Sequence, residues 1–172
     1  MKKGFTLIEL LVVVGIIIIL SAIILPNYRV GERQFALQRS AQKLAQDLRR
    51  AAELSTSAKP FRPDCSAQLG VDWIMRGYGI NLAAGDDYYF LKARCENTAS
   101  PGTYNDREVE KIDLEKGVKI LSTNTGSIFF YPPEPQVDLA GATTSVITIS
   151  LKIDETQTKI IKVNQSGLIN VE

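Results

Sequence analysis

Apolar residues follow three different patterns along the chain. Phe5 to Leu25 is an almost unbroken apolar run. After Pro26, apolar positions recur at spacings of three, four and seven, which is the pattern of one face of an amphipathic helix. That face comprises Val30, Leu37, Ala41, Leu44, Leu48, Ala51 and Ser55. From Val71 onward the period is that of strands. The patterns therefore predict an apolar helix, an amphipathic helix and a β-rich domain, in that order.

Short apolar or alternating segments separated by turn residues make up the β-rich part. The predicted strands are Val71–Met75, Tyr78–Leu82, Tyr88–Ala93, Val109–Leu114, Val118–Leu121, Ile128–Tyr131, Ser145–Ile153, Thr158–Asn164 and Leu168–Val171. Asp154 to Gln157 joins two of them in a pattern typical of a hairpin. We expect an α+β fold, in which a long N-terminal helix packs on an antiparallel β-sheet head.

The first apolar run is long enough to cross a bilayer as a helix, given a rise of about 1.5 Å per residue. A cleavable secretory signal would need a site with small residues after the run. The run is instead followed by Pro26, Asn27, Tyr28 and Arg29. The run therefore predicts a membrane-inserted helix and disfavours an ordinary signal peptide.

Glu9 is a carboxylate inside this apolar run. Placing an acidic side chain near the middle of a membrane span costs roughly 2.5 to 3.5 kcal/mol, and less near an end. One interpretation is that Thr6 and Glu9 form a polar fringe at the membrane interface. The other is that a partner compensates for the charge.

The start of the chain resembles a known family. Gly4 to Glu9, followed by Leu10 to Val14, is similar to the type III signal sequence of the type IV pilin and type II secretion pseudopilin superfamily. The similarity covers roughly Lys2 to Tyr28. It implies that a prepilin peptidase cleaves after Gly4 and methylates the new amino terminus, Phe5. It also implies that Glu9 acts in assembly.

The same resemblance implies a division of the chain into four parts. These are a leader at residues 1–4, a transmembrane and assembly helix at 5–25, an amphipathic stalk helix at 26–59 and an antiparallel β head at 60–172. The family's helix kinks at the proline matched by Pro26, where the missing backbone donor weakens a helix. An equally good interpretation is that Pro26 only marks the end of the membrane span.

The composition changes this picture at two points. The chain has no histidine, which removes the commonest general base and metal ligand. No catalytic group, metal site or cofactor is predicted, and adjacent Asp86 and Asp87 are expected in a solvated turn because they supply too few ligands for a cation. Cys65 and Cys95 fit one disulfide if the head lies outside the cytoplasm, and two buried free thiols are the alternative.

Charge is unevenly distributed, although the formal net charge is +1. From Asn27 to Ala58 there are six basic and three acidic residues, whereas from Pro63 onward ten basic residues face fifteen acidic ones. A basic stalk could lie against anionic lipid or pair with acidic heads of neighbouring subunits. The acidic head gives no reason to expect nucleic-acid binding.

A looser similarity involves the head. Arg76 to Ile80 and Ile160 to Ile169 are similar to segments of the H-type minor pseudopilins and their minor-pilin relatives. Gly77 and Gly79 lack the spacing of a phosphate-binding loop, so turn or bulge roles are expected for them.

Together these observations predict a structural subunit of a type II secretion pseudopilus or type IV pilus, and not an enzyme. Its expected partners are a prepilin peptidase, other pilin or pseudopilin subunits, an inner-membrane assembly platform and membrane lipid. Lys2 and Lys3 favour a cytoplasmic amino terminus, although Arg29 and Arg33 on the other side oppose this orientation. With the cleavage motif in the cytoplasm, the protein crosses the inner membrane once, with its head outside, before entering the filament. The alternative is a membrane-anchored extracellular binding domain or enzyme with an uncleaved anchor.

Overall fold

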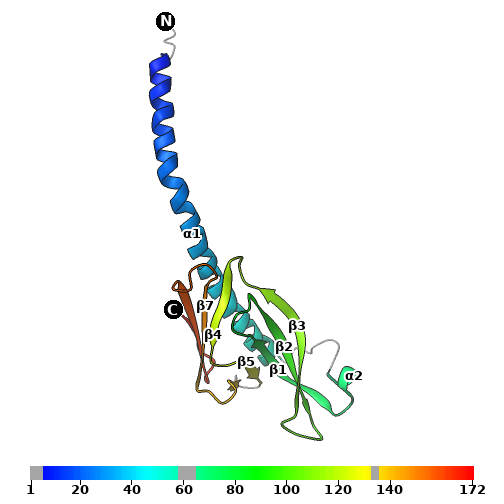
Figure 1. Ribbon diagram of the computed structural model, residues 1–172. Helices are drawn as coiled ribbons and strands as arrows, with labels where there is room; N and C mark the ends of the chain where they lie inside the picture. The colour runs from blue at the N-terminus through cyan, green and yellow to red at the C-terminus, as the bar shows by residue number, and fades with distance from the viewer. Residues whose placement is uncertain (1–5, 58–64, 133–135) are drawn as a thin grey trace. The chain divides into compact units, whose positions relative to one another are not determined.

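The computed structural model of the chain describes residues 6–57, 65–132 and 136–172, without side chains for residues 23–30, 67 and 68. The chain divides into two compact units, residues 1–35 and residues 36–172. Helix α1, from Leu7 to Thr56, contributes to both units. Figure 1 shows its blue part in the first unit and its cyan part in the second.

The second unit contains α2 and all the strands that the structure describes. The elements are α2 (Cys65–Leu69), β1 (Trp73–Asn81), β2 (Tyr88–Asn97), β3 (Tyr104–Asp113), β4 (Val118–Thr123), β5 (Ser127–Tyr131), β6 (Gln136–Asp138), β7 (Thr144–Leu151), β8 (Thr158–Asn164) and β9 (Ile169–Val171). They form two antiparallel sheets, with strand orders β3-β2-β1-β5-β6 and β4-β7-β8-β9. The expected helix-on-sheet α+β fold is confirmed, with the head divided between two sheets.

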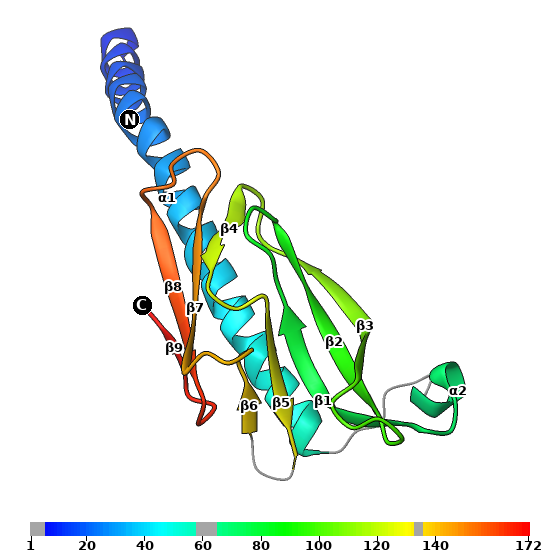
Figure 2. The same ribbon diagram turned by 60° about the horizontal axis from the view of Figure 1, so that its bottom comes forward.

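Residues 36–56 of α1 pack against both sheets around one hydrophobic core. In Figure 2 this cyan part of the helix passes between β7, β8 and β9 on one side and β1, β2 and β3 on the other. The buried face carries Leu37, Ala41, Leu44, Leu48, Ala51 and Ser55, as its spacing predicted. The side chain of Val30 lies outside the described residues. Burial of each leucine contributes about 1.5 to 3 kcal/mol.

Strands β2 and β7 contribute alternate side chains to this core. On β2 the buried residues are Tyr89, Leu91, Ala93 and Cys95, and on β7 they include Ser145, Ile147 and Ile149. Tyr88, Phe90, Lys92 and Arg94 lie on the opposite face of β2, because successive side chains of a strand alternate in direction. The first sheet therefore has one face against α1 and a second, outer face.

The predicted break between a strand ending at Met75 and a strand beginning at Tyr78 is wrong, because both segments belong to strand β1. It is continuous, with a register irregularity between Met75 and Gly77 where it pairs with β2. A side chain at Gly77 or Gly79 would collide with β5, since a Cβ atom at Gly77 would lie 2.0 Å from the Phe130 carbonyl oxygen. The glycines thus allow the close approach of two strands. Gly77 lies at the register irregularity, as the expected bulge role requires, whereas Gly79 lies in regularly paired strand and not in a turn or bulge.

The turn between β1 and β2 covers the free edge of β4 and so joins the two sheets. The Gly85 amide donates to the Ile120 carbonyl oxygen at 2.7 Å, and the Ile120 amide donates to the Asp86 carbonyl oxygen at 2.8 Å. Lys152 Nζ lies 2.6 Å from Asp87 Oδ2, which lowers the pKa of that carboxyl through a hydrogen bond and charge attraction. The adjacent aspartates therefore lie in a turn that connects the sheets.

Candidate functional site

The N-terminal helix begins immediately after a capping threonine. The Glu9 amide donates to Thr6 Oγ1 at 3.3 Å, and the Leu10 amide donates to the Thr6 carbonyl oxygen at 3.2 Å. The first bond satisfies one of the amide donors that a helix terminus leaves without an intrahelical partner, and the second is the first backbone bond of the helix. Thr6 and Glu9 have the spacing of a capping box. The spacing of Thr6 and Glu9 in the sequence is thus a signal for this cap, which neither the polar-fringe interpretation nor the motif resemblance predicts.

Glu9 lies in the first turn of α1 with its side chain exposed. A carboxylate at this position is favoured by the partial positive charge of the helix N-terminus. The flanking residues are apolar, so the carboxylate is a single charged point on an apolar helix surface. The processing residues Gly4 and Phe5 lie outside the described residues, and their roles stay predictions.

Apolar side chains cover all sides of the first part of α1. From Leu7 to Leu20 they are exposed, with fractions of 81% at Leu7 and 52% at Leu20. A helix that is apolar all round is stable only when lipid or protein surrounds it. Among the described residues, no helix combines the length and the hydropathy needed to cross a membrane.

Pro26 lies within the residue range of α1, which continues from Leu7 to Thr56. The structure does not describe the side chains of residues 23–30, which include Pro26. A kink at this position therefore stays a prediction.

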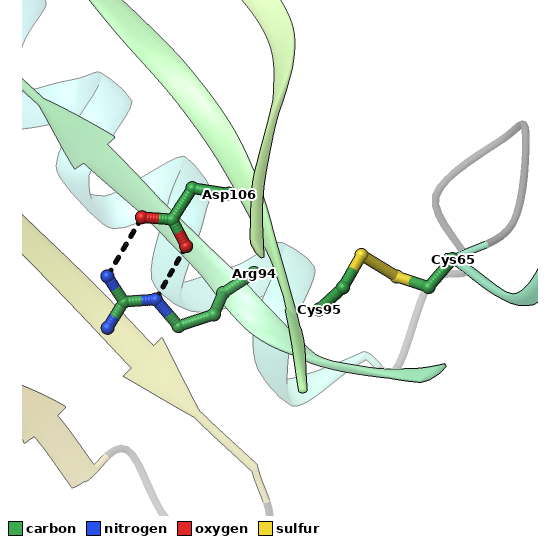
Figure 3. Close-up of a disulfide and its surroundings, with 4 residues drawn as sticks. All are labelled: Cys65, Arg94, Cys95 and Asp106. Carbon is green, nitrogen blue, oxygen red and sulfur yellow. Dashed lines mark hydrogen bonds and ion pairs between the residues drawn. A yellow bond between two sulfur atoms is a disulfide. The ribbon is translucent and has the colours of Figure 1, made fainter. Parts of the chain in front are cut away.

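The head contains a disulfide between Cys65 and Cys95. It connects the first residue of α2 to β2 across thirty positions of sequence, and both residues are fully buried. Figure 3 shows Cys95 directed toward Cys65 while the neighbouring Arg94 is directed to the other side of β2. A bond that closes such a loop stabilises a fold mainly by restricting the unfolded chain.

Arg94 is the centre of a polar cluster on the outer face of the first sheet. Its Nε and Nη2 donate to the two carboxylate oxygens of Asp106 at 2.7 and 2.9 Å (Figure 3). Its Nη1 donates to Asp138 Oδ2 at 2.9 Å and to Tyr131 Oη at 3.0 Å. The guanidinium also stacks 3.5 Å from the Phe129 ring centroid, a favourable cation–π arrangement. Four strands are joined through one side chain.

Burial and hydrogen bonding set the ionisation of this cluster. Burial alone would lower the pKa of Arg94, but its hydrogen bonds to Asp106 and Tyr131 raise it above the ordinary value. Burial raises the pKa of Tyr131 to about 12, although the nearby Arg94 opposes the shift. Both side chains therefore keep their protons at neutral pH, and the hydrogen bonds of the cluster hold β2, β3, β5 and β6 together. Alternation along β2 places Arg94 outward, but its partners on β3, β5 and β6 could not be read from the sequence.

Within residues 6–57, 65–132 and 136–172, no three histidine, cysteine, aspartate or glutamate side chains are grouped to hold a metal ion. Tyr89 Oη donates to Asp47 Oδ2 at 2.6 Å, and burial followed by this hydrogen bond raises the pKa of the tyrosine. This bond ties β2 to α1 and leaves the phenol protonated.

Comparison with known proteins identifies one match. Residues 1–25 match a protein-family model described as the prokaryotic N-terminal methylation motif. No curated protein and no solved structure matches the chain. The matched residues include Gly4, Phe5, Thr6 and Glu9, so the motif coincides with the capped, apolar start of α1. The match supports the type IV pilin and pseudopilin class, whose subunits a prepilin peptidase processes.

Proposed function

We propose that this protein is a structural subunit of a type IV pilus or a type II secretion pseudopilus, assembled through its N-terminal helix. The match of residues 1–25 to the methylation motif carries the proposal. Cleavage after Gly4 and methylation of Phe5 prepare the chain for assembly, and the subunit then leaves the membrane and joins a filament. The energy for extraction from the membrane comes from a separate assembly ATPase, since the sequence has no nucleotide-binding motif.

Glu9 is the assembly residue in this proposal. Once Phe5 carries a free amine, the carboxylate of Glu9 on a neighbouring subunit can pair with it in the low dielectric of a helix bundle. Burial of an unpaired charge is costly, so one axial offset between helices is favoured over others. Buried polar residues select the register of coiled coils in the same way. The exposed apolar side chains from Leu7 to Leu20 would supply the packing surface.

The membrane stage follows from the same N-terminal segment. Residues 5–25 anchor the subunit in the inner membrane, with Lys2 and Lys3 on the cytoplasmic side where the peptidase acts. The head then lies outside the cytoplasm. The disulfide of Cys65 and Cys95 supports this location, because disulfides persist mainly in oxidising compartments.

Within this class, the protein is proposed to be a minor subunit and not the main subunit of the filament. Arg76 to Ile80 resembles the H-type minor pseudopilins, and these residues form the part of β1 where glycines permit the close approach of β5. The copy number of the chain relative to the main filament subunit tests this assignment. A ratio near one would contradict it.

The decisive experiment is the intact mass and amino-terminal peptide of the protein from its native membranes. We expect a chain that begins at N-methylated Phe5. A chain that retains Lys2, Lys3 and Gly4 in cells with an active prepilin peptidase would indicate an anchored extracellular domain instead.

A pair of variants then tests the assembly role. Glu9→Gln should be cleaved but should be largely absent from sheared filaments, because it cannot pair with the Phe5 amine. Glu32→Gln is the matched control, since it removes an exposed carboxylate from the same helix. Equal incorporation of both variants would refute the role of Glu9.

A further inference from the structure

The exposed face of α1 in the second unit is polar throughout and mainly basic. Within residues 36–56 the exposed side chains are Gln38, Arg39, Gln42, Lys43, Gln46, Arg49, Arg50, Glu53 and Thr56. Positions three and four apart lie on the same side of a helix, so these residues form one continuous stripe. We call Arg39, Lys43, Arg49 and Arg50 the basic ridge.

Two cations of the ridge are held in place without losing their charge. Lys43 Nζ donates to the Asp113 carbonyl oxygen at 2.9 Å, and Arg49 Nη2 donates to the Ile169 carbonyl oxygen at 3.4 Å. A carbonyl oxygen orients a cation but does not neutralise it.

Carboxylates compensate the ridge only in part. Arg50 forms an ion pair with Glu110 at 2.9 Å, and Glu53 is the exposed acid on the same stripe. Asp47, the remaining charged residue of residues 36–56, is half-buried and accepts the hydrogen bond of Tyr89. Positive charge is therefore in excess on the exposed side of the helix.

The composition of the stripe favours a layer of anionic headgroups over a protein partner. Protein interfaces are centred on buried aromatic and other apolar side chains, and charged residues are depleted there. In residues 36–56 every exposed side chain is polar, so the stripe has no such centre. Arginine, lysine and glutamine side chains instead supply the donors that phosphate oxygens accept.

The proposed function supplies a surface of this chemistry close to the ridge. Residues 5–25 are proposed to anchor the subunit in a membrane, and the ridge follows along the same chain. Arg29 and Arg33 continue the positive charge between the apolar run and Arg39. A surface joined to the ridge through the chain has a high effective concentration, so weak contacts are sufficient.

The contact requires a bend between the anchor and the ridge. Along a straight helix, Arg39 to Arg50 would lie roughly 20 to 40 Å beyond Leu25. Screening limits the attraction between exposed charges to about 8 to 10 Å. Pro26 and Gly31 lie in the intervening segment, and both residue types weaken a helix. A Cβ atom at Gly31 would meet no described atom within 4 Å, so packing does not require glycine there.

We propose that the basic ridge binds anionic phospholipid headgroups while the subunit is anchored, so that the head docks on the membrane surface before extraction. The inference rests on the membrane stage of the proposed function and gives the head a lipid-binding face of its own. Extraction then has to release the ridge as well as the apolar helix.

The experiment measures how close the ridge comes to lipid headgroups. The full chain is reconstituted into vesicles of phosphatidylcholine, or of an equimolar mixture with phosphatidylglycerol. A fluorophore attached at Gln46→Cys transfers energy to a headgroup-labelled lipid; Cys65 and Cys95 form a disulfide and do not react with the label. Transfer should be roughly twofold higher with the anionic lipid, which attracts each nearby cation. Sodium chloride at about 1 M should remove the difference, because the screening length falls to about 3 Å.

A pair of double variants assigns the effect to the ridge. Arg39→Gln with Lys43→Gln should abolish the response to phosphatidylglycerol. Arg76→Gln with Lys162→Gln removes two cations outside α1, whose side chains are 49% and 40% exposed, and it should respond like the wild type. Thermal melting of each variant checks that the head remains folded.

Each outcome bears on the proposal. Equal transfer in the two kinds of vesicle would overturn it and would indicate an acidic protein as the occupant of the ridge. An equal loss of response in both double variants would overturn it too, because net charge and not the ridge would then govern the contact. Failure of the chain to float with vesicles of either composition would refute the membrane stage of the proposed function itself.

Discussion

Replacement of Arg94 by methionine should destabilise the head substantially. Methionine keeps an apolar stem over Phe129 but removes the four hydrogen bonds to Asp106, Asp138 and Tyr131. Removal of one partner of a buried ion pair costs about 3 to 5 kcal/mol. The side chains of Asp106 and Asp138 are 28% and 36% exposed, so water will rehydrate part of each carboxylate. We therefore expect a loss of about 2 to 4 kcal/mol in the free energy of unfolding.

Urea and thermal unfolding of the full chain in detergent, followed by circular dichroism, would measure this loss. A change of 1 kcal/mol shifts the melting temperature of a chain of this size by about 2 to 4 °C, so the expected shift is roughly 4 to 16 °C. Arg76→Met is the matched control. Arg76 pairs with Glu96 at 2.7 Å, but its side chain is 49% exposed, and exposed ion pairs contribute about 0 to 1 kcal/mol.

Two results would refute the reasoning about Arg94. One is a stability of Arg94→Met within about 0.5 kcal/mol of the wild type, which is the usual range for surface substitutions away from special features. The other is an equal loss for Arg76→Met, which would show that the number of charges matters more than their burial. Arg94→Lys should lie between the methionine variant and the wild type, because lysine keeps the charge but lacks the bidentate geometry.

Further predictions concern packing and ionisation in the head. Gly79→Ala should lower the free energy of unfolding in urea by about 1 to 3 kcal/mol, because its Cβ atom would lie 2.3 Å from the Ile128 carbonyl oxygen. Gly126→Ala, whose Cβ atom would make only ordinary contacts, is the control, and an equal loss in both variants would contradict the explanation. Ser150→Ala should be neutral or stabilising in the same assay, since the buried Ser150 hydroxyl has no hydrogen-bond partner within the described parts of the chain, and a clear loss of stability would contradict this explanation. Tyr131, with a pKa raised from 10.0 to about 12, binds its proton more tightly in the folded state, so its contribution to stability is complete below pH 10 and is lost between pH 10 and about 12. Ultraviolet titration of Tyr131→Phe against the wild type should remove one late-ionising phenol, and loss of a phenol that ionises near pH 10 would contradict the assignment.

The elements of the fold could be predicted wherever local pattern and burial agree. The α1 face from Leu37 to Ser55 was predictable because a single helix buries one side against both sheets. β8 was predicted with its observed bounds, Thr158–Asn164, because it alternates between turns. In both cases the periodicity in the sequence directly reflects which side of the element faces the core.

Other elements gave no readable pattern. β3 begins at Tyr104, five residues before its prediction, because an edge strand with polar residues on both faces lacks alternation. β6 has only three residues and depends on its pairing with β5. Helix α2 has five residues, and it lies beside a disulfide rather than in the core.

The candidate site was predictable to the extent that it is local. Glu9, Gly4 and Phe5 occur in one short motif, whereas the Arg94 cluster gathers partners from strands separated by up to 44 positions. Such a cluster forms only when the sheet order is known. The partition of the head into two sheets likewise depends on long-range pairing, which no local pattern encodes.

The hydrogen bonds between the β1–β2 turn and β4 have a consequence for the way the head opens. Gly85 and Asp86 exchange backbone bonds with Ile120, so the four-stranded sheet cannot separate from the five-stranded sheet without breaking them. Amide hydrogen exchange should therefore give similar opening free energies for Ile120 and for the core of β2. Partial opening that spares one sheet would expose the β4 edge, and the shared bonds disfavour that intermediate. Under the proposed function, a subunit extracted from a membrane by its helix would therefore keep both sheets of its head folded together.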